Sequence, residues 1–444
     1  MKINKFTCLI IGLLAAVTGV KAQETKVPNV AQLTLKEALE VALQNNYDIK
    51  LSKNSTAIAK NNVTIGNAGM LPSVAGTFTQ SNSIQTTTQT RSDNTVNRIN
   101  NANNTGTNYG ANLNWTIFDG FNMFATYDQF KQQDQLAQTR LRDTIQRTVA
   151  NIIITYYDLV NQQKQIKALQ GVIDISRKQI RYSTDRFNAG AVARLDVYNA
   201  QVALNTDTAT LISQQQTFKA SKVELNRILA RNPQTEFNVA DTIIVDQKLM
   251  LGNIINEAQS QNPTLLLANI EQRLSEINLR QVKSTRYPQI AVNTGYTWSN
   301  SKNPAGFARV QNSRGLNYGL TASINIFDGF NQWRRERNAK LQIESSKISI
   351  ERARTNLEAQ IGQLYSAYLS GLELIRVGQA NVELARKSLE ISLEKYRIGT
   401  ITPLEIREAQ RNYLNATGVF YDAEYQVKAA ETTLKQITGN INIQ

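Results

Sequence analysis

Carboxylates, lysines and tyrosines are the side chains with which the mature chain would have to do any acid–base chemistry. Its 444 residues include no histidine, and the single cysteine, Cys8, lies in an N-terminal segment that we expect to be removed. His or Cys zinc sites, Ser-His-Asp triads and Cys-His dyads are therefore excluded. Asp196, Glu405 and Glu408 stand out among the acids, because each follows a glycine turn at the start of a helical stretch. No cleft-like set of paired carboxylates accompanies them, so the sequence predicts neither an enzyme nor a bound cofactor or metal.

Residues 1–22 have the composition of a secretory signal peptide. Lys2 and Lys5 precede the apolar residues 9–17, and small residues stand at the cleavage positions before Gln23. A membrane anchor is the alternative, but the apolar run is shorter than the roughly 20 residues that a spanning helix needs. A lipid anchor at Cys8 is disfavoured, because a lipidated cysteine would follow the apolar run. We expect a secreted chain that begins near Gln23.

The chain is basic, with a formal net charge of +14. Such a charge invites a nucleic-acid interpretation. Here, however, the lysines and arginines are spread along helical stretches beside Asp and Glu, with no dense basic block and no interleaved aromatic platform. Solvated helix faces explain this pattern better, and the sequence predicts no nucleic-acid partner.

An internal duplication organises the chain. Residues 108–231 return 209 positions later as residues 317–440 without a gap, and both copies contain the segment Ile-Phe-Asp-Gly-Phe-Asn. Internal repeats fix an architecture before any other signal does. The expected units are a signal (1–22), a first repeat (23–230), a linker with a short strand (231–251), a second repeat (252–440) and a short tail (441–444).

Each repeat has two segments in which apolar and polar residues alternate, at about 73–83 and 107–118 and at about 289–299 and 317–327. Alternation over about ten residues, with aromatic residues toward the ends, is the pattern of a membrane β-barrel strand. A half-buried strand of a soluble sandwich is the alternative. The polar residues 81–107 are predicted to form an exposed, mobile loop. On the membrane interpretation, the lipid-facing residues include Tyr109, Leu113, Trp115, Tyr296, Trp298 and Tyr318.

Four strands cannot close a barrel by themselves. The smallest membrane barrels have about eight strands, and an open sheet edge is not tolerated in lipid. If these strands span a membrane, several copies of the chain must pool them. Three copies would supply twelve.

Long helices make up most of each repeat. Residues 121–187 and 330–397 lack proline and keep a heptad seam over more than five heptads, which is typical of coiled-coil packing. At 1.5 Å per residue, each helix would be roughly 100 Å long. Glycine turns end both, and shorter helices return over 194–229 and 403–437. Further apolar residues beside the seam favour contact with neighbours on two sides, as in a cylinder of helices. The predicted class is mainly α with a small β part.

The two turns between long and returning helices carry a repeated motif. An aromatic residue and a glycine are followed by an acid, an aliphatic residue and an alanine. The motif residues are Phe187, Gly190, Asp196, Val197 and Ala200 in the first repeat, and Tyr396, Gly399, Glu405, Ile406 and Ala409 in the second. Together with the Phe-Asp-Gly-Phe strand ends, this motif resembles the helical tips of the TolC family of outer-membrane efflux proteins. The resemblance covers essentially the whole mature chain.

The resemblance implies a homotrimer. Its long coiled-coil helices would form a trimeric α-barrel, a twelve-helix tunnel through the periplasm, and its strands a twelve-stranded β-barrel in the outer membrane. The implied function is a passive exit duct of a tripartite efflux or type I secretion system, opened at its tips by a periplasmic adaptor protein and an inner-membrane transporter. The tip residues expected to contact the adaptor are Phe187, Gly190, Leu195, Gly399 and Leu404. The alternative from another class is a secreted coiled-coil structural protein or adhesin without a pore.

The resemblance also assigns a gate at the tips. Asp196 and Tyr396 match latch positions, and Glu405 and Glu408 match acids that face the pore. A ring of such acids would favour cations. The alternative for Asp196 and Glu405 is an ordinary helix start, where a negative side chain is favoured.

One position departs from the family pattern, and one segment has two interpretations. The family's best-known members have an arginine two residues after the second tip glycine, where this chain has Ile401, so the latch is weaker or Arg194 or Arg397 substitutes. The segment Trp333-Arg334-Arg335 follows the fourth strand. It is compatible with an anchor at the periplasmic membrane face and equally with a solvated helix start.

Overall fold

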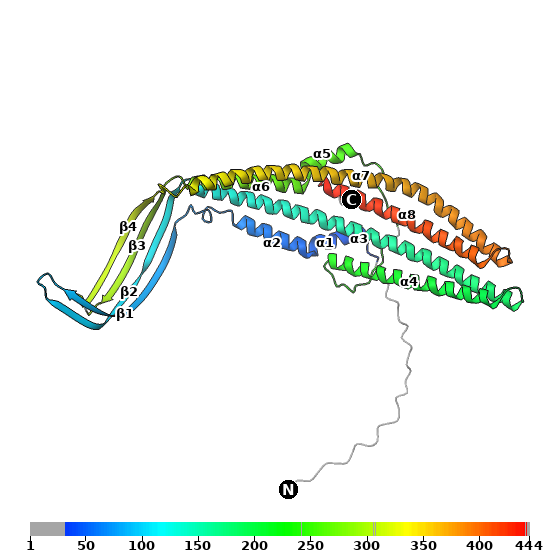
Figure 1. Ribbon diagram of the computed structural model, residues 1–444, viewed down its shortest axis with the longest axis horizontal. Coiled ribbons are helices and arrows are strands. Elements are labelled where there is room, and N and C mark those ends of the chain that lie inside the picture. The colour runs from blue at the N-terminus through cyan, green and yellow to red at the C-terminus, as the bar shows by residue number, and fades with distance from the viewer. Residues whose placement is uncertain (1–31, 241, 305, 307, 440, 442–444) are drawn as a thin grey trace, which may run out of the picture.

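The computed structural model describes residues 32–240, 242–304, 306, 308–439 and 441. The signal peptide expected at 1–22 lies outside these residues, as does most of the tail expected at 441–444. The described chain is long and narrow, with a four-stranded sheet at one end and a bundle of helices behind it (Figure 1). The predicted class, mainly α with a small β part, is confirmed.

Two helices, α3 and α7, run along the whole bundle, and shorter helices pack beside them (Figure 1). No helix of the described residues is both long and apolar enough to cross a membrane. The helix bounds are α1 Leu35–Asn45, α2 Tyr47–Asn61, α3 Asn122–Asn188, α4 Arg194–Ile228, α5 Leu251–Gln261, α6 Pro263–Ser284, α7 Asn331–Ile398 and α8 Pro403–Ile437.

The helices lie side by side in a fixed order. Next to the sheet the order is α2, α3, α6, α7, and toward the far end it is α4, α3, α8, α7. Four helices therefore stand abreast at both levels. One edge of this layer is α7 along its full length, and the other edge is α2 near the sheet and α4 near the far end.

Both long helices begin at the same left-handed turn. The φ angles are +70° at Gly120 and +70° at Phe121, and +66° at Gly329 and +63° at Phe330. Only glycine fits at the first position of the first repeat, because a Cβ at Gly120 would lie 2.2 Å from the Ser284 carbonyl oxygen. The duplicated Asp-Gly-Phe segment thus lies where the chain passes from the sheet into a long helix.

Two apolar clusters hold the middle of the bundle together. The first packs α1 against α3, α4 and the start of the linker, and the second packs α5 against α7 and α8. Tyr156 of α3 donates a hydrogen bond to the Leu33 carbonyl at 3.0 Å, and Tyr368 of α7 donates one to the Asp246 carbonyl at 2.5 Å. The clusters use equivalent elements of the two repeats.

The short strand expected in the linker 231–251 is not found there in the described residues. The linker has a single parallel bridge, between Asn238 and Gln32. Val239 and Ile243 instead pack into the first apolar cluster. Of the apolar residues that suggested a strand, Ile243 and Val245 therefore serve the helical core, whereas Ile244 is exposed.

The sheet is antiparallel, with strand order β1-β2-β3-β4. The strand bounds are β1 Ser73–Thr90, β2 Val96–Asp119, β3 Gln289–Lys302 and β4 Val310–Ser323.

The prediction of a mobile loop at 81–107 is wrong. β1 and β2 continue through most of this segment as a paired hairpin, in which Ser81 lies opposite Gly106 and Thr90 opposite Val96. The strand pair is held by backbone hydrogen bonds, which need no apolar side chains. The Asn, Thr, Ser and Gln residues of the hairpin therefore gave no alternating pattern from which it could be predicted.

β4 ends at Ser323, short of the predicted residue 327, and β3 continues to Lys302, beyond the predicted residue 299. Ser323 lies opposite Gln289, the first residue of β3. Residues 324–327 consequently have no strand of the same chain to pair with.

Candidate functional site

The two helical turns lie together at the end of the bundle that is farthest from the sheet (Figure 1). Gly190 and Gly399 take left-handed φ angles of +73° and +84° there. Leu195 and Leu404, each just inside a returning helix, are 63% and 76% exposed, and Phe187 is also exposed. The tip residues predicted from the sequence therefore form the outer end of the molecule.

Glu405 caps helix α8. Its carboxylate accepts hydrogen bonds from the Thr402 backbone N–H at 2.7 Å and from the Thr402 hydroxyl at 2.8 Å, and the Thr402 hydroxyl accepts one in return from the Glu405 backbone N–H. These bonds, that from the backbone first, hold the pKa of Glu405 below its ordinary value. In this chain Glu405 has the helix-start role that the sequence left open.

The other predicted acids lie apart. Asp196 is half-buried in the first turn of α4, and Glu408 is exposed on α8, where it pairs with Arg411 at 2.5 Å. No group of three or more acidic, His or Cys residues able to hold a metal ion is found in the described part of the chain. Within one chain the acids do not form a common site.

Tyr396 makes a contact between the two helical hairpins, which are α3–α4 and α7–α8. It is 1% exposed, and its hydroxyl lies 2.6 Å from that of Ser183 on α3. Neither arginine proposed as a substitute for the family's latch arginine crosses between the hairpins in the described residues. Arg397 pairs with Glu394 one turn back, and Arg194 lies over the Tyr198 ring.

A buried polar cluster links the same hairpins farther from the tips, and the sequence did not reveal it. Asp207 of α4 is 4% exposed and accepts hydrogen bonds from Arg407 of α8 and from Ser176 of α3, both at 2.8 Å. Gln410 of α8 donates to the Ser176 hydroxyl at 3.2 Å. Since α3 lies between α4 and α8, the small side chain of Ser176 leaves room for Arg407 to reach across. We call these four residues the Asp207 cluster.

All six residues predicted to face lipid lie on one face of the sheet. Tyr109 is opposite Trp298, and Tyr318 is opposite Thr294, which in turn is opposite Leu113. Directly opposite residues of neighbouring strands share a face, and residues two apart along a strand do too. The Tyr109 and Trp298 rings are stacked, with centroids 5.5 Å apart.

The opposite face of the sheet is polar. Asparagine amides bond to threonine hydroxyls of the next strand, as from Asn317 to Thr297 at 3.0 Å and from Asn293 to Thr321 at 3.2 Å. Along β4, Tyr318 lies midway between Ser323, the last residue at the helix end of the sheet, and Arg314, where the apolar face of the strand becomes polar. The sheet thus has an apolar band on one face and polar residues on the opposite face.

The two outer strands are unpaired on one side. In the described residues β1 pairs only with β2, and β4 only with β3. Such edges expose rows of backbone N–H and C=O groups. In water the apolar face would be exposed, and in lipid the open edges would leave backbone hydrogen bonds unsatisfied. A single sheet of this kind is therefore unfavourable in either solvent.

Comparison with known proteins agrees with this geometry. A family profile described as "Outer membrane efflux protein" matches residues 38–231 and 254–440, which are the two repeats. The chain belongs to this family. The resemblance inferred from the tips is therefore confirmed, and membership in the outer membrane efflux protein family assigns the chain to the outer membrane, with its helices on the periplasmic side.

Among its relatives, the Outer membrane protein TolC of Escherichia coli is 22% identical over 67% of this chain, which spans 62% of that protein. The Outer membrane efflux protein BepC of Brucella suis is 22% identical over 92% of this chain and 86% of its own length. Among solved structures, the Campylobacter jejuni CmeC outer membrane channel is similar with a TM-score of 0.77 and 18% identity, over 91% of this chain and 85% of that one. Because the sequence identity is low, this structural similarity establishes the fold alone.

Proposed function

We propose that three copies of this chain assemble into one closed duct, which passes solutes through the outer membrane without doing chemistry on them. The observation that carries the proposal is the pair of open sheet edges beside an apolar face. Lipid cannot satisfy an open edge, so β4 of one copy would pair with β1 of the next until the ring closes. Three copies would supply twelve strands, which is enough for a barrel.

The edges of the helical layer support the same closure. On α7, apolar side chains that the single chain leaves exposed recur every seven residues near the tips, at Val377, Leu384, Ile391 and Ile398. The opposite edge, α4, exposes Leu195, Tyr198, Val202 and Ile212. Because α7 and α4 are the two edges at this level, α7 of one copy would pack against α4 of the next as a coiled coil.

Near the sheet, α7 would meet α2 of the next copy in the same way. There α7 exposes Leu341 and Ile348, and α2 exposes Tyr47, Leu51 and Ile58. Three copies would then place twelve helices around the tunnel at both levels. The polar face of the sheet would line the membrane part of the duct.

At the tips, a periplasmic adaptor and an inner-membrane transporter would deliver the cargo. The exposed Leu195 and Leu404 are suited to an adaptor contact. The family description supports efflux, and the proposed cargo is small molecules or proteins. The closed gate would be held within each chain by the Ser183–Tyr396 contact and the Asp207 cluster. Asp196 and Glu408 would carry negative charge at the narrow end and favour cations.

Conductance measurements test this proposal. Detergent-purified protein added to planar lipid bilayers is expected to give stepwise currents, and native mass spectrometry is expected to give the mass of a trimer. A water-soluble monomer that needs no detergent and gives no currents would contradict the duct. That result would favour the pore-free coiled-coil protein.

A charge on the apolar face of the sheet is expected to block insertion. Tyr318→Arg places an arginine at the middle of the apolar band, where a cation costs about 2–4 kcal/mol in each copy. The matched control is Asn317→Arg, one residue away on the polar face. Heat-modifiable electrophoresis of outer-membrane fractions should show trimer for Asn317→Arg and little for Tyr318→Arg. Equal insertion of both variants would mean that the two faces are assigned wrongly.

A further inference from the structure

The start of α7 carries a group of cations found only once per chain. Four basic residues and one acid, Glu336, lie within its first ten positions. At the equivalent positions of the first repeat, 209 residues earlier, only one basic residue remains, although the aromatic residues around them are kept. The basic residues are Arg334, Arg335, Arg337 and Lys340, and their counterparts are Ala125, Thr126, Asp128 and Lys131.

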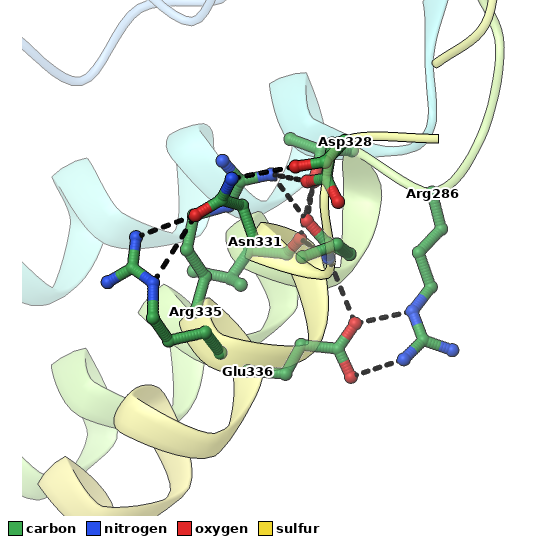
Figure 2. A network of polar contacts seen from close by, with 9 residues as sticks. Arg286, Asp328, Asn331, Arg335 and Glu336 are labelled. Atoms are coloured by element: carbon green, nitrogen blue, oxygen red, sulfur yellow. Dashed lines mark hydrogen bonds and ion pairs between the residues drawn. The ribbon is translucent and has the colours of Figure 1, made fainter. Parts of the chain in front are cut away.

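One of these arginines braces the junction between sheet and helices. Figure 2 shows Arg335 and Glu336 within a polar network at the start of α7. Arg335 pairs with Asp328 at 3.0 Å, and Arg286 holds both oxygens of Glu336. Burial disfavours ionised Glu336, but hydrogen bonds from Gln332 and Arg286 outweigh it and lower the pKa of Glu336. Both acids of this network, Asp328 and Glu336, are thus already occupied.

The other three cations have no such partner. Arg334, Arg337 and Lys340 are exposed, and none of them forms an ion pair with a carboxylate of the described residues. Arg337 lies over the Trp333 ring, 5.3 Å from its centroid, and Arg334 reaches only the Asn331 amide oxygen, at 3.3 Å. Their charge is available to an external anion.

The helix end itself strengthens the preference for an anion. α7 begins without a side-chain cap and has no acid in its first turn. The N-terminal end of a helix carries a partial positive charge, so cations placed there repel it and an anionic group is stabilised. Arg334, at the fourth position of α7, is therefore unfavourable unless an anion compensates it, and Arg337 and Lys340 follow within the next two turns.

The exposed aromatic residues beside these cations indicate which kind of anion they bind. Phe327, Phe330 and Trp333 are 71%, 75% and 60% exposed, directly beside the cations and next to the helix end of the apolar band. Exposed aromatic residues at such a boundary are typical of a membrane–water interface. Cations that follow them on the helix side lie at the depth of lipid head groups.

We propose that Arg334, Arg337 and Lys340 bind the phosphate head group of an anionic phospholipid in the periplasmic leaflet. Trp333 and Phe330 would contact the adjoining acyl chains. This inference rests on the proposed position of the sheet in the membrane. Each chain has one such group of cations, so a trimer has three sites.

Native mass spectrometry of the detergent-purified trimer tests the site. The protein is titrated with phosphatidylglycerol or with zwitterionic phosphatidylethanolamine, and retained lipids are counted. The test variant is Arg334→Gln/Arg337→Gln/Lys340→Gln. The control is Lys347→Gln/Arg352→Gln/Arg354→Gln, which removes the same charge from α7 but, at 1.5 Å per residue, roughly 20 Å farther from the membrane. The test variant is expected to bind phosphatidylglycerol roughly 100-fold more weakly, since each cation near an anionic surface contributes about fivefold.

Three results would overturn the assignment. They are equal phosphatidylglycerol retention by the test and control variants, equal retention of both lipids by the unmodified protein, and displacement of the lipid by millimolar inorganic phosphate, which would indicate a simple anion site. Conductance separates this inference from the duct itself. The test variant is expected to remain a conducting trimer, so a loss of lipid with unchanged currents supports the site and leaves the duct intact.

Discussion

Asp207→Ala is expected to destabilise the contact between the two helical hairpins by about 3 kcal/mol, because it leaves the half-buried Arg407 without an acidic partner. Ser176 loses its acceptor in the same step. If the Asp207 cluster helps to hold the tips closed, about 3 kcal/mol shifts the ratio of closed to open tips by more than 100-fold. The expected result is a lower thermal unfolding temperature together with larger or longer currents in lipid bilayers.

A double-mutant cycle identifies the pair as the cause. Arg407→Ala leaves Asp207 buried and unpaired, so it is expected to be at least as damaging, whereas the double variant should recover part of the loss. Glu373→Ala is the matched control, because it removes an exposed pair with Arg376 that contributes little. Unchanged stability and unchanged currents in Asp207→Ala would show that the cluster does not hold the hairpins together.

Leu384→Glu combined with Ile391→Glu is expected to abolish the trimer. In the single chain these side chains are 65% and 58% exposed, and packing against α4 of the next copy would bury them. The variant forfeits roughly 1.5–3 kcal/mol of burial at each position, and buried carboxylates without partners add to the loss. Because the ring has three equivalent joints, the trimer suffers this loss three times, once at each joint. Light scattering in detergent should detect monomers.

The matched control for this experiment is Glu390→Lys combined with Glu394→Lys. These residues lie on the charged face of α7, where they pair with Arg386 and Arg397. Reversing two such charges changes the solvation of the same stretch of helix without touching the apolar row. A trimer that survives Leu384→Glu/Ile391→Glu would place the joint between copies elsewhere.

Local signals account for what the sequence predicted correctly. Gly190 and Gly399 mark the tips because left-handed turns favour glycine, and the alternation in β3 and β4 marks a sheet with one apolar face. The extension of β1 and β2 through residues 81–107 was not predicted, because backbone pairing imposes no side-chain pattern on a segment of Asn and Thr residues. Sequence-local reasoning stops where structure depends on backbone pairing alone.

The polar contacts between the two helical hairpins could not be predicted from the sequence for another reason. Asp207 and Arg407 are 200 residues apart in the chain, and Ser183 and Tyr396 are 213 apart, so neither pair has a local pattern. A weak signal existed: Ser176 and Ser183 interrupt the apolar heptad seam of α3. A small hydroxyl on such a seam indicates a buried polar partner, but it does not say which one.

The hairpin that continues β1 and β2 past Lys302 has a consequence for selection on the cell surface. Its residues from Ser83 to Thr90 and from Val96 to Asn104 extend beyond the point where β3 stops, at the end opposite the helices. Outside the cell it would form a finger made mostly of uncharged polar residues, the first part that an antibody or a phage meets. Exchanges there alter no apolar face and no helix contact, so immune pressure can diversify the finger while the wall beneath it stays the same.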